Sequence, residues 1–186
     1  MPGKKHLAVF VAAFSVILGP LFTTTLLFAA SKEKVLYSFG PSGVLGPTAG
    51  LSFDTSGNLY STTYMGGDLN EGTVWELMHK IGGGWTEKIL YDFGSDGGGP
   101  AAGVIVDAAG NLYVTTYGSS AIYRVTPDRQ VALLCQDIES EALCLTTNCA
   151  FAGPNFDQLL VANLGHHHLA VLDLKVKGQP LWNQRA

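Results

Sequence analysis

The sequence has few charged side chains and no cluster of basic ones. Only 14% of its 186 residues are charged, 15 acidic against 11 basic, and the formal net charge is −4. Domains that bind nucleic acid carry a basic patch, so nucleic acid is excluded as the expected partner. Beyond residue 30 no stretch shows the period of about 3.6 residues that marks a substantial helix. The helical fold classes are therefore excluded as well.

Cysteine is scarce, and its spacing is not that of a metal site. The three cysteines, Cys135, Cys144 and Cys149, are an odd number without the paired spacing of structural zinc. In an oxidising compartment Cys135 and Cys144 could form a disulfide. The alternative is that both are reduced and buried, and the sequence does not decide between the two. Cys149 is predicted to be a core residue.

The first 30 residues are expected to be a hydrophobic leader helix outside the globular fold. Lys4 and Lys5 precede an apolar run, residues 7–30, which ends in small residues. This order is typical of an export signal, whereas the length of the run is that of a membrane span. We predict a signal peptide or a membrane anchor over 1–30, and a cleaved signal is favoured over membrane attachment through 7–30. The globular part is expected to be secreted or periplasmic, or else anchored to the membrane.

A repeat dominates the rest of the chain. Residues 49–64, AGLSFDTSGNLYSTTY, return 53 positions later as residues 102–117, AGVIVDAAGNLYVTTY. Each copy is an apolar run, an Asp-x-x-Gly-Asn turn, and a run of aromatic and β-branched residues, which predicts a hairpin of antiparallel strands. One such repeat cannot bury its apolar faces alone and has to stack on its neighbours.

The spacing of turns predicts four short strands in each repeat, which is the pattern of a propeller blade. Strands are expected at 34–39, 49–54, 59–64, 72–79, 85–93, 121–126, 130–135, 147–151, 158–163 and 169–174, with a loop at 65–71. The segment 36–40 is also echoed by 90–94. The fold expected for 31–186 is therefore all-β, a partial β-propeller of about three four-stranded blades at approximately 34–93, 94–135 and 136–186.

About three blades are fewer than a closed ring needs, since propellers have about four to eight. The two outermost sheets would then have exposed edges, which invite pairing with another chain. A homodimer could complete a six-bladed ring by symmetry. The chain could instead be a truncated or fused gene product, or an open arc of three blades, and the sequence leaves these alternatives open.

Two sets of motifs resemble known families. Residues 34–120 resemble the bacterial GloVer tandem repeat in their Leu-Tyr-x-Phe, Asp-x-x-Gly-Asn-Leu-Tyr and Gly-Thr-Val-x-Glu-Leu pieces. From Ala102 onward the chain resembles the senescence-marker-protein/gluconolactonase family; the segments that carry this likeness are 106–114, 122–125, 147–154 and 172–178. The second resemblance implies a six-bladed propeller that holds a divalent metal, often calcium, at one end of its channel and hydrolyses sugar lactones and related esters.

The same resemblance implies metal ligands that this sequence lacks. In the family, a Glu of the N-terminal blade, an Asn and an Asp hold the metal, which polarises the lactone carbonyl and activates water. The Asn and the Asp each precede a Gly that opens an innermost strand, and those slots hold Ala49 and Ala102 here. A methyl group cannot replace the oxygen ligands of a hard cation. No counterpart of the Glu blade is found, and the matching slot of the third repeat falls near Asn148, a weak channel candidate more simply explained as a cap of its own strand.

The other chemistry-bearing side chains are expected to be structural. Asp54 and Asp107 belong to turns. Consecutive strand residues point to opposite faces, so His166, His167 and His168 cannot converge on one ion from a strand. The tryptophans, Trp75, Trp85 and Trp182, are expected to pack between blades. No Ser-His-Asp order and no phosphate-binding glycine motif is present, so no catalytic residue is assigned.

Two functions fit these observations. The first is an exported gluconolactonase-like protein, related to metal-dependent sugar-lactone hydrolases, whose own activity is in question because of Ala49 and Ala102. If active, it would be a calcium-dependent lactonase. The second is a non-catalytic extracytoplasmic repeat module for binding or scaffolding. No cofactor is expected beyond the calcium that the resemblance implies, and the sequence does not define a substrate.

Overall fold

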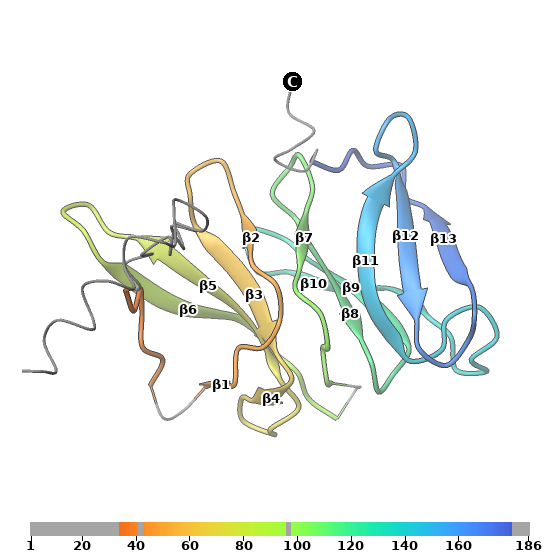
Figure 1. Cartoon of the computed structure of the whole chain (residues 1–186), viewed down its shortest axis with the longest axis horizontal. Coiled ribbons are helices and arrows are strands. Elements are labelled where there is room, and N and C mark those ends of the chain that lie inside the picture. The colour runs from red at the N-terminus through yellow and green to blue at the C-terminus, as the bar shows by residue number, and fades with distance from the viewer. Residues whose placement is uncertain (1–33, 41–42, 96–97, 180–186) are drawn as a thin grey trace, which may run out of the picture. The chain divides into compact units, whose positions relative to one another are not determined.

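The computed structural model describes residues 34–40, 43–95 and 98–179 of the chain (Figure 1). The predicted leader and Trp182 lie outside the described residues. The chain divides into two compact units, Met1–Lys34 and Val35–Ala186, and the following description concerns the second. Among the described residues no helix is long and apolar enough to span a membrane.

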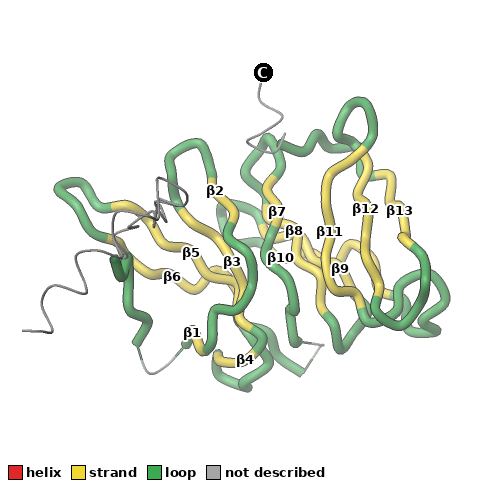
Figure 2. The backbone as a smooth tube through the Cα atoms, viewed as in Figure 1, coloured by secondary structure: helices red, strands yellow, loops and turns green. Residues whose placement is uncertain are grey.

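Three antiparallel sheets follow one another along the chain (Figures 1 and 2). The first sheet has the strand order β2 (Ser52–Phe53), β3 (Leu59–Thr63), β5 (Thr73–His79) and β6 (Trp85–Asp92). The second sheet has the order β7 (Ile105–Val106), β8 (Leu112–Thr116), β9 (Ala121–Val125) and β10 (Val131–Gln136). The third sheet has the order β11 (Thr146–Ala152), β12 (Gln158–Asn163) and β13 (Leu169–Asp173). Strands β2, β7 and β11 are the first of their sheets, and β7 contacts both of the others. The all-β partial propeller predicted from the repeat is confirmed.

The two copies of the repeat form equivalent hairpins, as predicted. Phe53 pairs with Leu59 in the first sheet, and Val106 pairs with Leu112 in the second, at positions 53 residues apart. Each hairpin turns at a glycine of positive φ, 82° at Gly57 and 83° at Gly110 in the second copy. Glycine adopts this conformation without steric cost, which explains why both turns keep it.

Three expectations differ from the structure. Residues 34–39 form no strand, because no described strand lies beside them to supply hydrogen bonds. The predicted loop 65–71 contains β4 (Met65–Gly66), which pairs with β1 (Val44–Leu45) in a small separate sheet. The third sheet has three described strands rather than four. All three differences concern pairing between distant segments, which the local pattern does not specify.

Apolar side chains fill the spaces between successive sheets. One buried cluster joins Val74 of the first sheet, and Phe93 directly after that sheet, to Val106 and Val114 of the second sheet and to Val104 directly before it. Another joins Ile122, which has no exposed surface, to the third sheet; its other buried members are Leu143, Cys149, Leu159 and Val161. Each sheet therefore depends on the next for burial, as stacked repeats require.

The two described tryptophans and the three cysteines take structural positions. Trp75 is 2% exposed and packs against Phe39, whose ring centroid lies 4.9 Å away, and Trp85 is partly buried in the same cluster. All three cysteines are free thiols, so Cys135 and Cys144 form no disulfide. Cys149 is buried as predicted, and its burial raises the pKa of its thiol to about 12.

Candidate functional site

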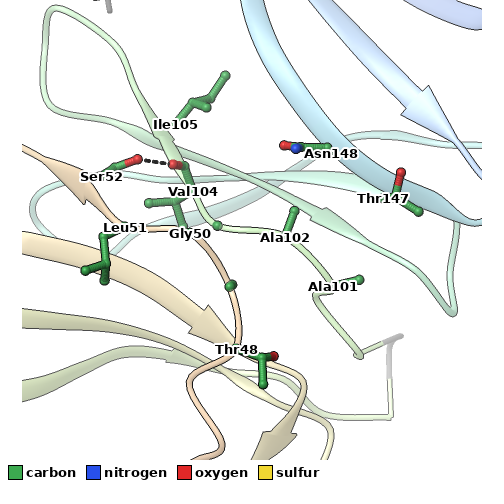
Figure 3. Close-up of a pocket in the computed structure, with 12 residues that line it drawn as sticks. Thr48, Gly50, Leu51, Ser52, Ala101, Ala102, Val104, Ile105, Thr147 and Asn148 are labelled. Atoms are coloured by element: carbon green, nitrogen blue, oxygen red, sulfur yellow. Dashed lines mark hydrogen bonds between the residues drawn. The ribbon is translucent and has the colours of Figure 1, made fainter. Parts of the chain in front are cut away.

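A cavity opens where the innermost segments of the three sheets meet (Figure 3). Its volume is about 400 Å³, and it is lined by residues 48–52, residues 101–105, Thr147 and Asn148. The first two segments are the same five positions of the repeat, 53 residues apart. The repeat therefore supplies two walls of the cavity, and the start of β11 supplies the third.

Small residues allow the first two walls to approach closely. A β-carbon built at Gly103 would collide with the backbone carbonyl of Gly50, so only glycine fits there. Two hydroxyl groups on β3, the second strand of the first sheet, hold these segments in place. Thr62 Oγ1 donates to the carbonyl oxygen of Ala102 at 2.6 Å, and Ser61 Oγ donates to that of Gly50 at 2.8 Å. The backbone of both walls is thus held by hydrogen bonds to β3, one buried and one partly buried.

The side chains that line the cavity are uncharged. They offer the methyl groups of Ala49, Ala101 and Ala102, the hydroxyl groups of Thr48, Ser52 and Thr147, and the amide of Asn148, with apolar Leu51, Val104 and Ile105. Three of the polar groups already have partners within the chain. Ser52 Oγ donates to the carbonyl oxygen of Val104, and Asn148 Oδ1 accepts from the backbone N–H of Cys149 at 2.9 Å. Thr147 Oγ1 donates to the carbonyl oxygen of Ala162 at 3.3 Å. Thr48 is the remaining hydroxyl-bearing side chain of the lining.

This lining does not fit a calcium ion. Calcium takes about six to eight oxygen ligands, usually with carboxylates among them. The lining residues include no carboxylate, and no three His, Cys, Asp or Glu side chains among the described residues are grouped so that they could hold a metal. Both alanines named from the motif, Ala49 and Ala102, do lie at the cavity. The residues present therefore provide polar contacts to a ligand but not the charge that a divalent ion needs.

The register of β11 refines the position of Asn148. Ile105 pairs with Tyr113 in the second sheet, and Ala150 pairs with Leu160 at the equivalent place in the third. Counting back two residues from Ile105 and Ala150 places Asn148 level with Gly103. Thr147 is then level with Ala102, next to the register shift between Thr146 and Asn148. Sequence reasoning missed Thr147, because the weak third copy of the repeat does not fix the alignment to one residue.

The aspartates of the repeat face their own turns, not the cavity. Asp107 Oδ1 accepts from the backbone N–H groups of Ala109 and Asn111, both at 2.9 Å. Its Oδ2 accepts from Asn111 Nδ2 at 2.7 Å and from the Tyr113 hydroxyl at 3.1 Å. Asp54 makes the same four contacts in the first sheet. The structural role predicted for both residues is confirmed.

The histidine triplet lies between two strands, as the expected strand bounds place it, so the argument from alternating strand residues does not apply to it. It occupies the bend between β12 and β13. The rings of His166 and His168 stack with centroids 5.2 Å apart. The Nε2 atoms of these two rings lie 2.5 Å from the carbonyl oxygen of Ser140 and 3.0 Å from that of Ala142. These contacts join the bend to the 140–142 loop, so the two rings have a structural use.

Alanine at Gly103 is expected to destabilise the chain by about 1–3 kcal/mol, because the added methyl group has to displace the backbone at Gly50. A suitable control is Gly40→Ala, since nothing lies within 4 Å of a β-carbon there and φ is not positive. Denaturant unfolding of both variants measures the difference. Equal midpoints would contradict the tight contact between the two walls.

Comparisons with known proteins agree with this architecture. The family model described as "SMP-30/Gluconolactonase/LRE-like region" matches residues 45–164. Regucalcin of Xenopus laevis is 25% identical over an alignment of 118 residues, and the match covers 52% of this chain and 38% of that protein. Among solved structures, a luciferin-regenerating enzyme superposes with a TM-score of 0.52 at 22% identity, covering 70% of this chain and 46% of the enzyme.

A calcium-binding protein, regucalcin of Agrobacterium tumefaciens, superposes with a TM-score of 0.51 at 20% identity, covering 70% of this chain and 47% of that one. This chain thus spans less than half the length of each of these three relatives. At such identities the two solved structures support the fold alone. The family model, however, matches more than half of the chain. The chain therefore belongs to the SMP-30/gluconolactonase/LRE-like family.

Proposed function

We propose that this chain is an exported binding protein of the SMP-30/gluconolactonase/LRE-like family that does not hydrolyse lactones with calcium. The observation that carries the proposal is the uncharged lining of the cavity. At the two positions where the family resemblance implies oxygen ligands for the metal, this chain has the methyl groups of Ala49 and Ala102. A divalent ion that should polarise a carbonyl group and activate water would lack the ligands to hold it.

The lining suits a small neutral ligand that carries hydroxyl or carbonyl groups. Its volume of about 400 Å³ lies within the range of small-molecule sites, roughly 300–1,000 Å³. Thr48 can donate to or accept from such a ligand, Thr147 can accept from it, and the alanine side chains can contact its carbon skeleton. Sugars and sugar lactones have this combination of groups. We therefore favour a ligand of that chemical class, bound without turnover.

Export is part of the same proposal, and it is based on the leader predicted over residues 1–30. Delivery to the periplasm or the cell exterior, or attachment to the membrane through 7–30, would place the cavity where free sugars occur. An active calcium-dependent lactonase is the competing function, because a solved relative is described as a calcium-binding protein. Calcium addition distinguishes the two.

Millimolar calcium is expected to leave the thermal midpoint of this chain unchanged, and lactone hydrolysis is expected to stay at the uncatalysed rate. A ligand at about a thousand times its Kd stabilises a protein by about 4 kcal/mol, which would raise the midpoint by several degrees. The Agrobacterium calcium-binding regucalcin serves as the positive control. A rise of several degrees in this chain, or hydrolysis that depends on calcium, would contradict the proposal.

The variant Ala102→Asp tests whether a decayed metal site remains. Ala102 is 8% exposed, so a carboxylate there would be largely buried and without a charged partner in the lining. We expect this variant to be less stable than the parent and to recover no stability in calcium. Calcium-dependent recovery would show that the other ligands are still present.

A further inference from the structure

On the face of the first sheet that is turned away from the second, the innermost segment is apolar and exposed, whereas the cluster around Trp75 on the same face is buried. Leu51 and Phe53 are 53% and 57% exposed. The same positions of the repeat in the second sheet are Val104 and Val106, which are 2% and 7% exposed because the first sheet covers them. Leu51 and Phe53 thus have the chemistry of an interface between sheets but no described sheet to cover them.

The third sheet has the complementary feature on its far face. Leu169 and Val171 on β13 are 64% and 55% exposed, while Ala170 and Leu172 between them pack toward the second sheet. The strand register shows that Ile122 in the second sheet and Val74 in the first are equivalent to Leu169 in the third. Leu169 pairs with Ala162, as Ile122 pairs with Thr115 and Val74 with Thr62. Val74 and Ile122 have no exposed surface because the following sheet covers each of them. Only the third sheet lacks such a cover among the described residues.

Residues 35–39 pack on the first sheet in the same way that the end of β6 and the residue after it pack on the second sheet. The Phe39 ring meets Trp75 edge-on, with centroids 4.9 Å apart, and also contacts Tyr37 at 5.3 Å. In the second sheet Phe93 meets Tyr123 at 5.5 Å and contacts Tyr91 at 4.9 Å. Trp75 and Tyr123 occupy the same register position, opposite Ser61 and Val114.

Residues 35–39 therefore occupy the place of an outer strand from a preceding sheet. Within that sequence echo, Leu36 corresponds to Leu90. Leu90 is 8% exposed, whereas Leu36 is 54% exposed. Leu90 packs in the cluster between the first and second sheets, whereas no described sheet covers Leu36.

The outer strand is the element that the third sheet lacks. Beyond β13 the described chain does not turn back along the edge of that strand. Instead, the N–H of Leu174 donates to Asp157 O at 3.1 Å, the N–H of Gly178 to Phe156 O at 2.7 Å, and the N–H of Gln179 to Val106 O at 3.3 Å. The chain is thereby directed toward the second sheet (Figure 1). The outer edge of β13 has no strand partner among the described residues.

We propose that two copies of this chain associate head to tail, with residues 35–39 of each copy added as the outer strand beside β13 of the other. The exposed pair Leu51 and Phe53 then covers Leu169 and Val171 of the other copy, as Val104 and Val106 cover the first sheet within one chain. Two such contacts related by a two-fold axis close a ring of six sheets. This inference does not depend on the ligand proposed for the cavity.

The internal sheets also predict the register of the added strand. In the first sheet Trp75 pairs with Ile89 and Val74 with Tyr91, which leaves Leu90 as a bulge. The second sheet has the same bulge, since Tyr123 pairs with Leu133 and Ile122 with Cys135. Transferred to the third sheet, this pattern pairs Val35 with Ala170 and Tyr37 with Leu169, with Leu36 as the bulge.

Cross-linking of the full chain tests this register. The double variant Val35→Cys/Ala170→Cys is expected to form a disulfide-linked dimer as its main species under mild oxidation, seen on non-reducing electrophoresis. The matched control, Val35→Cys/Ile138→Cys, carries its second thiol at a position that is 82% exposed and outside both faces. Native cysteines are present in both variants and give the same background. Equal yields of dimer from the two variants would overturn the proposed pairing.

Solution mass tests the association without new thiols. In a mild detergent that keeps residues 7–30 dissolved, the full chain is expected to have twice the mass of one copy. Leu169→Asp is expected to raise the concentration of half-dissociation at least tenfold, and Ile138→Asp to leave it unchanged. A monomer at every concentration, or a series of higher multiples, would overturn the closed pair. So would a monomer that Leu169→Asp destabilises, because another part of the same chain would then cover this face.

Discussion

Replacement of Asp107 by alanine is expected to lower the free energy of unfolding by about 4 kcal/mol, the largest loss predicted for a polar residue in this chain. Asp107 is 2% exposed. Its carboxylate accepts four hydrogen bonds, from the N–H groups of Ala109 and Asn111, from the Asn111 amide and from the Tyr113 hydroxyl. Alanine would leave all four donors without this acceptor inside a closed turn.

Tyr113 makes the loss at Asp107 more severe. Its side chain is 1% exposed, and its burial, together with the nearby Asp107 charge, raises the pKa of its hydroxyl above the usual range. The hydroxyl therefore stays protonated and continues to need an acceptor. The backbone of Asp107 also anchors the end of the described chain, because it bridges to Gly178 and its carbonyl accepts from Gln179 Nε2 at 3.0 Å.

The matched control is Asp54→Ala, at the same position of the first repeat. Asp54 makes the same four hydrogen bonds, but its side chain is only partly buried. Water can therefore replace the carboxylate for some of the donors, and we expect a loss of about 1–2 kcal/mol. Urea unfolding of both variants, in dilute protein, measures the difference. If the two losses were equal, burial by the neighbouring sheet would not be what makes Asp107 important.

Replacement of Phe93 by alanine is expected to cost about 3–5 kcal/mol, because the cavity it leaves lies between two sheets. Phe93 is 1% exposed and its ring contacts Tyr91 on its own sheet and Tyr123 on the next, with centroids 4.9 and 5.5 Å away. Both contacts are edge-on, the arrangement that aromatic rings prefer. The backbone also resists collapse here, since the N–H of Phe93 donates to the carbonyl of Gly72 at 3.0 Å.

Phe39→Ala is the corresponding control in the first sheet. Phe39 contacts Tyr37 and Trp75 in the same geometry but is only partly buried, so water can enter the space that it leaves. A loss of about 1–2 kcal/mol is expected in dilute protein. Thermal and denaturant unfolding of both variants would measure it. A Phe93 variant that unfolds at the midpoint of the parent chain would contradict the packing between the sheets.

The sequence by itself determined the elements that depend on neighbouring residues. The Asp-x-x-Gly-Asn turn needs an aspartate that can accept from N–H groups two and four positions later and a glycine that can adopt positive φ. Both requirements are local, so the motif predicts the same turn in both copies of the repeat. The constant offset of 53 then predicted equivalent sheets, because one such repeat cannot bury its apolar face alone.

Only the tertiary structure decided which segments meet. Residues 36–40 and 90–94 are nearly the same in sequence, yet 90–92 belong to a strand and 36–40 do not, because only the former have β5 beside them. Leu169 occupies the same position in its sheet as the buried Ile122, but it is exposed because no described sheet covers it. The cavity, with Thr147 on its wall, likewise forms from three segments far apart in the chain. Long-range pairing and burial depend on which distant segment packs against a residue, and the local sequence does not specify that segment.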